Sequence, residues 1–241
     1  MTSAAEPQRR GGAPLADTGR PNSLSNRLRS RRDVRLRALI QAIADQSRPT
    51  RILDIGGTVQ YWERVGFEFL RRHRAHVTVL NVVSDIKSAT ADFESVSLEI
   101  GDGCNLNQYA DRAFDLTHSN SVIEHVGDWS RMKQFAKESR RVAKNYYIQT
   151  PSFWFPIDPH YYKAPMIHWM PRPLRVKLLT TFSITHAGKV SSLDSAHHVL
   201  DSTRLLDERQ FRFLFPDAEI FRERIAGLTK SLIAIRRGGT D

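Results

Sequence analysis

Short apolar runs alternate with segments of helical periodicity between residues 51 and 149, and this alternation limits the possible folds more than any other feature of the sequence. A short run of apolar or β-branched residues is typical of a strand, whereas apolar residues spaced three and four apart are typical of a helix. Strands that alternate with helices form a parallel sheet covered on both faces. The predicted strands are residues 51–56, 76–83, 96–100, 114–118 and 146–149.

Three helices are predicted around these strands. The first begins near Ser23 and ends before Pro49, and its apolar residues follow a helical spacing. The other two are expected at residues 61–74 and 130–144. The pattern changes after Pro151, where aromatic residues and prolines become frequent, so we expect an insertion at about residues 151–203 with one short helix near residues 172–179.

The end of the chain is regular again. Residues 207–214 are predicted to be a helix, and two extended runs, 218–225 and 232–235, are joined by Gly227. Such a pair is typical of an antiparallel hairpin. The predicted fold class is therefore α/β: a doubly wound sheet, mostly parallel with an antiparallel C-terminal hairpin strand, and with helices on both faces. We expect it to form one domain over residues 23–241.

Positive charge is concentrated at the start of the chain. The net charge is +10, and residues 1–37 hold nine arginines against three acidic residues. Residues 1–22 show no periodicity, which favours a disordered basic arm. The alternative is an arm that contacts the phosphates of nucleic acid or an anionic membrane surface. We favour the solvated extension.

Other features point to a cytoplasmic protein. Cys104 is the single cysteine, so no intramolecular disulfide can form. The sequence has no apolar run of the roughly 20 residues that a membrane-spanning helix needs, and the first 22 residues lack the apolar core of a secretory signal.

The first predicted strand ends in Ile-Leu-Asp-Ile-Gly-Gly, residues 52–57. Ligands of doubly wound sheets bind beyond the carboxyl ends of the strands, and glycine lets the backbone turn sharply there. A dinucleotide site needs Gly-x-Gly-x-x-Gly, but Thr58, Val59 and Gln60 follow the two glycines. The sequence therefore gives little support to a pyrophosphate site.

Residues 50–236 resemble a class I S-adenosylmethionine-dependent methyltransferase of the small-molecule type. The resemblance rests on four features in the expected order. These are residues 52–57, the Gly-Asp-Gly at 101–103, the segment Phe114–Val126 with its Glu-His-Val ending, and the terminal hairpin. It implies a Rossmann-like fold, S-adenosyl-L-methionine as cofactor and methyl transfer as activity.

The resemblance also implies residues that hold the cofactor. Gly56 and Gly57 would form the turn at its methionine end. Asn81 would bond the ribose, where the family usually has an acidic residue, and an amide can still donate to and accept from hydroxyls. Asp102 with Gly103 would meet the adenine; the alternative is that Asp102 is a turn residue.

Two further residues are candidates for the cofactor site, each with an alternative. Asp54 would contact the cofactor directly or order the first loop. Ser119 would line the methionine end or cap the following helix.

The catalytic candidates are histidines, because the imidazole pKa lies near neutrality. His160 lies in the aromatic insertion and is preferred over His125, which the family often carries without using it as a base. Five aromatic residues would wall an acceptor pocket or form the core of a cap: Phe153, Trp154, Phe155, Tyr161 and Tyr162. Some quinone-modifying relatives hold a metal with Glu-x-x-Glu-His, but Ser121 occupies the first of these positions, so no metal is expected.

The expected function is methyl transfer to an oxygen or nitrogen of a small or lipid-like acceptor. Two alternatives stay open: a nucleic-acid methyltransferase that uses the Arg-rich arm, and a non-catalytic binding protein that keeps the fold. The sequence does not identify the acceptor or the oligomeric state.

Overall fold

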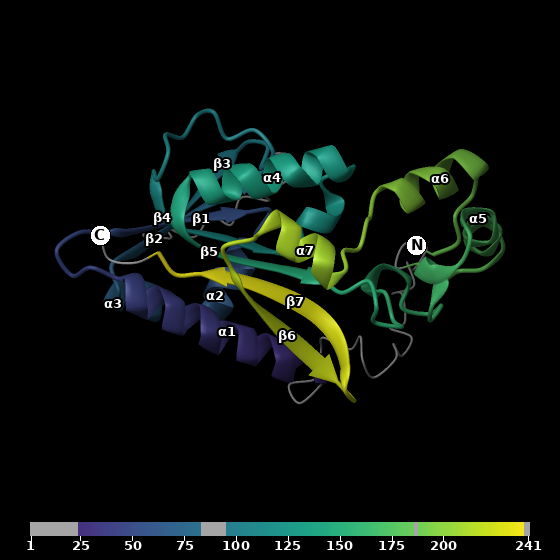
Figure 1. Ribbon diagram of the computed structural model, residues 1–241, viewed down its shortest axis with the longest axis horizontal. Coiled ribbons are helices and arrows are strands. Elements are labelled where there is room, and N and C mark those ends of the chain that lie inside the picture. Colours follow the sequence, from purple (N-terminus) through teal and green to yellow (C-terminus); the bar gives the residue numbers. More distant parts are fainter. Residues whose placement is uncertain (1–23, 83–94, 186–187, 239–241) are drawn as a thin grey trace, which may run out of the picture.

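The computed structural model describes residues 24–82, 95–185 and 188–238. Its centre is a seven-stranded sheet in the order β3-β2-β1-β4-β5-β7-β6 (Figure 1). The strands are β1 (Thr50–Ile55), β2 (Ala75–Asn81), β3 (Val96–Ile100), β4 (Phe114–Asn120), β5 (Ala143–Pro151), β6 (Glu219–Ile225) and β7 (Leu228–Arg236). Strands β1 to β5 are parallel to their neighbours, whereas β7 is antiparallel to β5 and to β6. The predicted fold class is confirmed.

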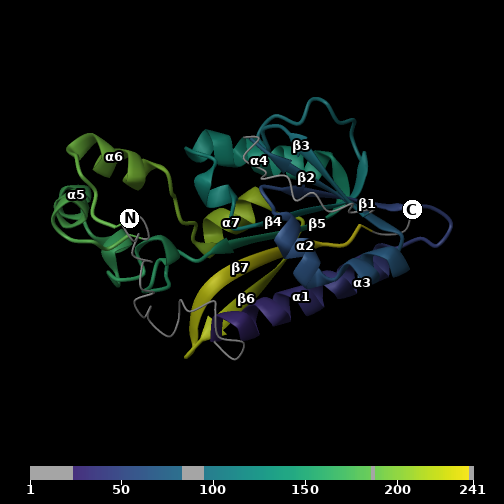
Figure 2. The same cartoon turned by 180° about the vertical axis from the view of Figure 1, so that it is seen from behind.

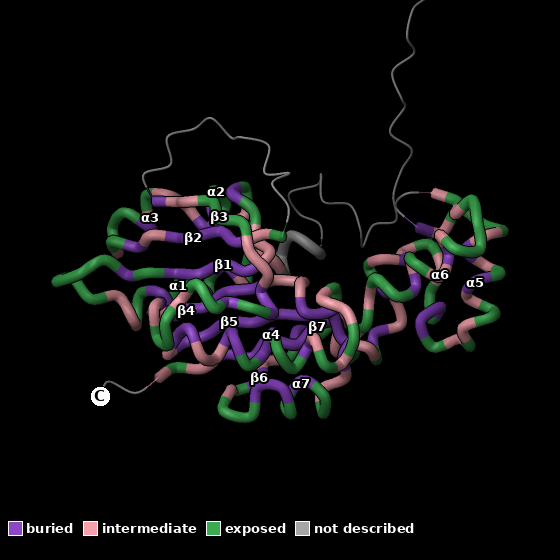
Figure 3. Tube along the Cα trace, turned by 90° about the horizontal axis from the view of Figure 1, so that it is seen from above, coloured by how far each residue is buried: buried purple, intermediate pink, exposed green. Residues whose placement is uncertain are grey.

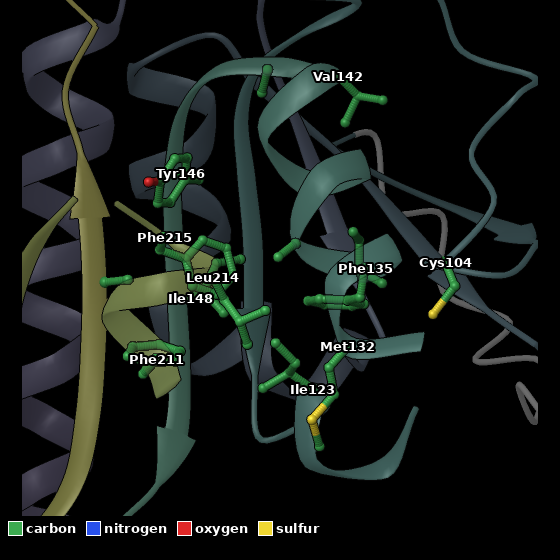
Figure 4. Packing of buried hydrophobic residues seen from close by; sticks show 14 of the residues in the cluster. Cys104, Ile123, Met132, Phe135, Val142, Tyr146, Ile148, Phe211, Leu214 and Phe215 are labelled. Carbon is green, nitrogen blue, oxygen red and sulfur yellow. The ribbon is translucent and has the colours of Figure 1, made fainter. Parts of the chain in front are cut away.

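Helices cover both faces of the sheet (Figures 1 and 2). Helices α1 (Leu24–Ile43), α2 (Val59–Val65) and α3 (Phe67–Arg72) lie on one face, and α4 (Trp129–Arg141) and α7 (Glu208–Leu214) lie on the other. Neighbouring residues of a strand point to opposite faces. Tyr146 and Ile148 of β5 accordingly pack under α4 and α7, and Tyr147 packs under α1 and α2. Figure 4 shows the first of these two clusters.

Two predicted helices are longer than the observed ones. The segment 61–74 divides into α2 and α3 at Gly66, whose φ of 105° suits glycine and interrupts the helix. The segment 130–144 ends as a helix at Arg141, because residues from Ala143 onward join the sheet as β5. A fully buried strand is apolar on both faces and resembles a buried helix in sequence.

The segment between β5 and α7 forms a separate lobe. It contains two short 3-10 helices, Pro159–Tyr161 and Ile167–Trp169, followed by α5 (Arg172–Thr181) and α6 (Leu193–Asp201). Helix α6 is absent from the sequence prediction. The lobe stands beside the carboxyl end of β5 and is more exposed than the sheet (Figures 1 and 3). Its own core is small, and consists of Tyr161, Ile167, Val176, Leu179, Ala196 and Leu200.

Arginines of α1 bind other parts of the protein. Arg32 donates to Glu223 at 2.7 Å and to Asn120 at 3.1 Å. Asp33 accepts two hydrogen bonds from Arg64. These contacts hold α1 on the sheet. The predicted basic arm, residues 1–22, lies outside the described residues. Among the residues that are described, no helix is both long and apolar enough to cross a membrane.

Candidate functional site

The turn after β1 can be formed only by glycines. Gly56 has a φ of 71°, and a Cβ there would lie 2.6 Å from Val122. A Cβ on Gly57 would lie 1.6 Å from a carboxylate oxygen of Asp54. The backbone N–H of Gly56 donates to Leu80 of β2 at 2.7 Å. The loop therefore lies directly against the ends of two neighbouring strands.

Asp54 lies inside the core rather than on the loop surface. Its carboxylate accepts from Trp62 Nε1 at 2.6 Å and is 2.7 Å from His118 Nδ1, and the residue is fully buried. These bonds join α2, β1 and β4, which favours the loop-ordering alternative. A direct contact with the cofactor stays a prediction. His118 was not singled out in the sequence, because its role depends on a neighbour 64 residues away.

Asn81 ends β2 beside the glycine turn. Its side-chain N–H donates to the carbonyl oxygen of Gly57 at 3.0 Å. Within the described part of the chain no donor reaches its side-chain oxygen, which can therefore accept from a hydroxyl of a ligand. Whether Asn81 bonds the ribose of the cofactor stays a prediction.

Asp102 follows β3 and is held by two partners. It accepts from the backbone N–H of Cys104 at 2.9 Å and from the Arg131 guanidinium of α4 at 2.7 Å. Burial raises the pKa of Asp102, but the Cys104 N–H and the Arg131 guanidinium outweigh burial and hold that pKa below its ordinary value. The carboxylate is therefore ionised at neutral pH and is oriented as an acceptor.

Gly103 and Ser119 complete this edge of the sheet. A Cβ on Gly103 would lie 2.5 Å from Ile55, so the backbone of the third loop approaches β1 closely. Ser119 is fully buried and donates to the carbonyl of Ile55 at 3.0 Å, which ties β4 to β1. The structure thus brings the ends of β1, β2, β3 and β4 together. Whether Ser119 also contacts the cofactor stays a prediction.

These features fit S-adenosylmethionine. The close backbone approaches at Gly56, Gly57 and Gly103 make a narrow cradle, and Asn81 and Asp102 offer acceptors at its rim. The cofactor carries no phosphate, so the cradle does not need the third glycine of a dinucleotide loop.

His125, in a short 3-10 helix after β4, and His160, in the lobe after β5, come together. Their Nε2 atoms are 3.0 Å apart. Asp158 accepts from His160 Nδ1 at 2.7 Å, and the Ser202 carbonyl accepts from His125 Nδ1 at 3.0 Å. Burial lowers the pKa of His160, but Asp158 outweighs it and leaves that pKa above its ordinary value, whereas burial leaves the pKa of His125 below its ordinary value.

Glu124 lies beneath the two imidazoles and is fully buried. One carboxylate oxygen accepts from Thr150 at 3.0 Å, and the other has no partner among the described residues. Burial raises the pKa of Glu124 to about 7. One ligand atom of each of Glu124, His125 and His160 lies within 4.8 Å of the others, so these three residues could hold a metal ion, whereas no metal was expected from the sequence because of Ser121.

A cavity of about 280 Å³ lies within the lobe, and all its lining residues come from the segment between β5 and α7. Asp158 and Thr203 line it and also contact the two histidines. Phe153 and Tyr161 line it as expected, but Trp154, which is 62% exposed, is not among its lining residues, and neither are Phe155 and Tyr162. The cavity also contains three arginines that the sequence analysis did not single out: Arg172, Arg175 and Arg204.

Comparisons with known proteins agree with this geometry. Residues 53–146 match the model of a family described as a methyltransferase domain. No match was found among curated proteins.

Among solved structures, the PH0226 protein from Pyrococcus horikoshii OT3 is 16% identical, with 89% of this chain and 91% of that chain covered and a TM-score of 0.52. An S-adenosylmethionine-dependent methyltransferase from Methanosarcina mazei is 14% identical, with 81% and 94% covered and a TM-score of 0.52. The DszA carbon methyltransferase is 10% identical, with 91% and 56% covered and a TM-score of 0.58.

The solved structures share the fold, and the matching family model covers β1 to the start of β5 with the glycine cradle, Asn81 and Asp102. The sheet order with its antiparallel β7 agrees with both. Residues 53–146 are therefore similar to a methyltransferase domain, and the chain shares its fold with a solved S-adenosylmethionine-dependent methyltransferase.

Proposed function

We propose that this enzyme methylates an oxygen or nitrogen atom of a small acceptor that carries an acidic group. The observation that carries the proposal is the cavity of about 280 Å³ in the lobe that follows β5, with arginines in its wall. This volume suits a small molecule rather than a polymer segment or a lipid chain. The lipid-like acceptor expected from the sequence is therefore the weaker candidate.

The charges in the cavity favour an anionic acceptor. Arg172 is neutralised by Asp201, which accepts from both of its terminal nitrogens at 2.6 and 2.7 Å. Arg175 and Arg204 have no acidic partner within 4.0 Å among the described residues, and Nε of Arg175 is buried without a hydrogen-bond partner. A guanidinium binds a carboxylate or phosphate with two parallel hydrogen bonds. Such a group on the acceptor would supply the missing partner.

The cofactor would be held at the carboxyl ends of β1, β2, β3 and β4. We propose that the turn at Gly56 and Gly57 lies against its methionine end and that Asn81 binds its ribose. Asp102 and Gly103 would contact its adenine. Asp54 and Ser119 are proposed to keep this cradle in shape, because their own bonds tie β1 to α2 and β4. The cofactor supplies an activated methyl group, so the protein needs mainly to align the acceptor and exclude water.

His160 and His125 are proposed to meet the reacting end of the acceptor. Asp158 supports this assignment, because it lines the cavity and also holds His160. Phe153 and Tyr161 would form the apolar wall that excludes water. In this arrangement the acidic group of the acceptor stays at the arginines of the cavity and does not enter the cofactor cradle.

The nucleic-acid alternative has less support. Arg32 of the Arg-rich segment is bound to Glu223 and Asn120, and its side chain is 12% exposed. Arg35 lies over the ring of Phe221 and Arg37 over the ring of Phe69. These side chains stabilise the position of α1, so they are less able to contact phosphates.

The proposal can be tested with cofactor that carries an isotopically labelled methyl group. The enzyme and labelled cofactor are added to cell extract that has been separated into small molecules, lipids and nucleic acids. The small-molecule fraction is then divided by anion exchange. Label is expected in retained small molecules. Label confined to the nucleic-acid fraction, the lipid fraction or unretained small molecules would contradict the proposal.

A further inference from the structure

The two histidines at the strand ends face one another in an arrangement that needs a cation between them. Nε2 of His125 and Nε2 of His160 are 3.0 Å apart. In a neutral imidazole one nitrogen carries hydrogen and the other carries a lone pair. The partners of the two Nδ1 atoms therefore decide what the two Nε2 atoms present to each other.

The nearest partner of each Nδ1 atom only accepts, although His125 Nδ1 also lies 3.3 Å from the Thr203 hydroxyl. His160 Nδ1 is 2.7 Å from the carboxylate of Asp158, and His125 Nδ1 is 3.0 Å from the backbone carbonyl of Ser202. The Asp158 carboxylate and the nearer Ser202 carbonyl thus favour a hydrogen on each Nδ1, which leaves lone pairs on both Nε2 atoms. Two lone pairs at 3.0 Å repel unless a proton or a metal ion lies between them.

Glu124 supplies negative charge at the same point. The carboxylate is fully buried, and one of its oxygens has no donor among the described residues. An unpaired carboxylate is costly to bury, and a bound cation removes that cost. The ligand atoms of all three residues already lie within 4.8 Å of one another.

The distances suit a metal ion. Two nitrogens bound to zinc at about 2.0–2.1 Å, with an angle of about 90–110° between them, lie about 2.9–3.4 Å apart. The observed 3.0 Å is within this range. The hydrogen bonds from Nδ1 to Asp158 and to the Ser202 carbonyl are also those that orient metal-bound histidines in proteins.

We propose that Glu124, His125 and His160 bind a divalent transition-metal ion of the Zn²⁺ type. Two imidazole nitrogens favour such an ion over Mg²⁺, which prefers oxygen ligands. The set differs from Glu-x-x-Glu-His, because its third ligand comes from the lobe, 35 residues after His125. The absence of an acidic residue at Ser121 therefore does not exclude a metal, contrary to the expectation from the sequence.

The site borders the cavity that we assign to the acceptor. Asp158 and Thr203 line the cavity and contact the two histidines. Three protein ligands leave a coordination position open on zinc, and an oxygen of the acceptor could occupy it. This placement of the acceptor rests on the proposed function, whereas binding of the ion does not.

Calorimetry on the full chain tests the proposal. The protein is treated with a chelator, dialysed into metal-free buffer and titrated with ZnCl₂ and, separately, with MgCl₂. One Zn²⁺ per chain is expected to bind, and Mg²⁺ is not. His160→Ala, His125→Ala and Glu124→Gln should each weaken Zn²⁺ binding at least tenfold, and Asp158→Asn should weaken it about 10–100-fold through His160. His198→Ala, on the exposed surface of α6, is the matched control.

Each variant is checked by circular dichroism and by binding of S-adenosylhomocysteine, so that loss of the fold is recognised. The proposal is overturned if the parent protein takes up no Zn²⁺, which would leave a shared proton between the histidines. It is also overturned if His160→Ala binds Zn²⁺ as tightly as the parent. Neither result affects the acceptor assignment, because no acceptor is present in this experiment.

Discussion

The candidate residues on the cofactor side and those on the acceptor side of the strand ends differ in how fully their polar groups are hydrogen-bonded. Asp54, Asn81, Asp102 and Ser119 each bind another part of the protein. Around the lobe, by contrast, buried atoms of Glu124, His168 and Arg175 have no partner among the described residues. Buried polar groups are normally hydrogen-bonded. Thr117 Oγ1 and His118 Nε2 of β4 are also buried without a partner among the described residues, so the contrast holds for the candidate site residues: those of the cofactor side are already bonded, and bonds on the acceptor side would be completed by something that binds.

The two sides also differ in how they are stabilised. The sheet lies between two large hydrophobic clusters, whereas the lobe depends on one small cluster. Changes on the cofactor side should therefore affect the fold and the cofactor together. Changes on the acceptor side should affect turnover while cofactor binding is preserved.

The largest effect is expected from Gly57→Ala. The new Cβ would lie 1.6 Å from the Asp54 carboxylate, so the turn and the buried Asp54 bonds cannot both persist. Binding of S-adenosylhomocysteine should be lost and the free energy of unfolding should fall by about 1–3 kcal/mol, the cost of overpacking. Calorimetry and urea unfolding measure both. Gly238→Ala is the control, because its contact of 3.3 Å with Lys144 is mild. Normal binding in Gly57→Ala would show that the loop adapts.

His160→Ala should lower turnover without changing the affinity for the cofactor. Removing a group that meets the reacting end of the acceptor is expected to lower kcat by about a hundredfold or more. The affinity for S-adenosylhomocysteine should stay at the parent value, because His160 touches no residue of the cradle. Turnover with an identified acceptor and calorimetry give the two numbers. Unchanged kcat would mean that His160 serves only to pack the lobe.

Asp102→Ala should weaken cofactor binding without abolishing it. A cofactor donor would lose its acceptor, so binding of S-adenosylhomocysteine should weaken by about 1–3 kcal/mol. Arg131→Gln is the informative comparison, because it removes the ion pair with Asp102 but keeps the carboxylate. If Asp102→Ala binds as the parent does, the residue only forms the turn with Cys104.

Arg175→Gln should affect the acceptor more than the cofactor. The loss of a charged hydrogen bond is expected to raise the KM for an anionic acceptor about tenfold, with little change in kcat. Arg209→Gln, on the exposed surface of α7, is the matched control. Equal KM values for the parent and Arg175→Gln would remove the main support for an acidic group on the acceptor.

Deletion of residues 1–22 should have the smallest effect. The composition of this segment predicts few buried contacts, so cofactor affinity and the midpoint of thermal unfolding should stay close to those of the full chain. Thermal unfolding followed by circular dichroism and calorimetry test this expectation. A large fall in the midpoint would show that the arm packs on the domain.

The sheet and the candidate residues of the cofactor side could be predicted because the sequence patterns that indicate them extend over only a few neighbouring residues. Each of the first five strands was recognisable within ten residues of sequence, and their alternation with helices implied a parallel sheet. Gly56, Gly57, Asn81 and Asp102 follow strands, so their meeting at one edge follows from the topology. The limits of α4 and β5 were less accurate, because a strand buried on both faces has no period that separates it from a helix.

The sequence by itself determined the fold class, the order of the strands along the chain and the residues at their carboxyl ends. The tertiary structure alone decided which distant side chains meet: Asp54 with His118, Asp102 with Arg131, and Glu124 and His125 with His160. It also decided that Arg32 of α1 bonds to Glu223 and that arginines of the lobe line a cavity. The physical reason is that periodicity and turn residues act over a few neighbours, whereas these contacts depend on how whole elements pack.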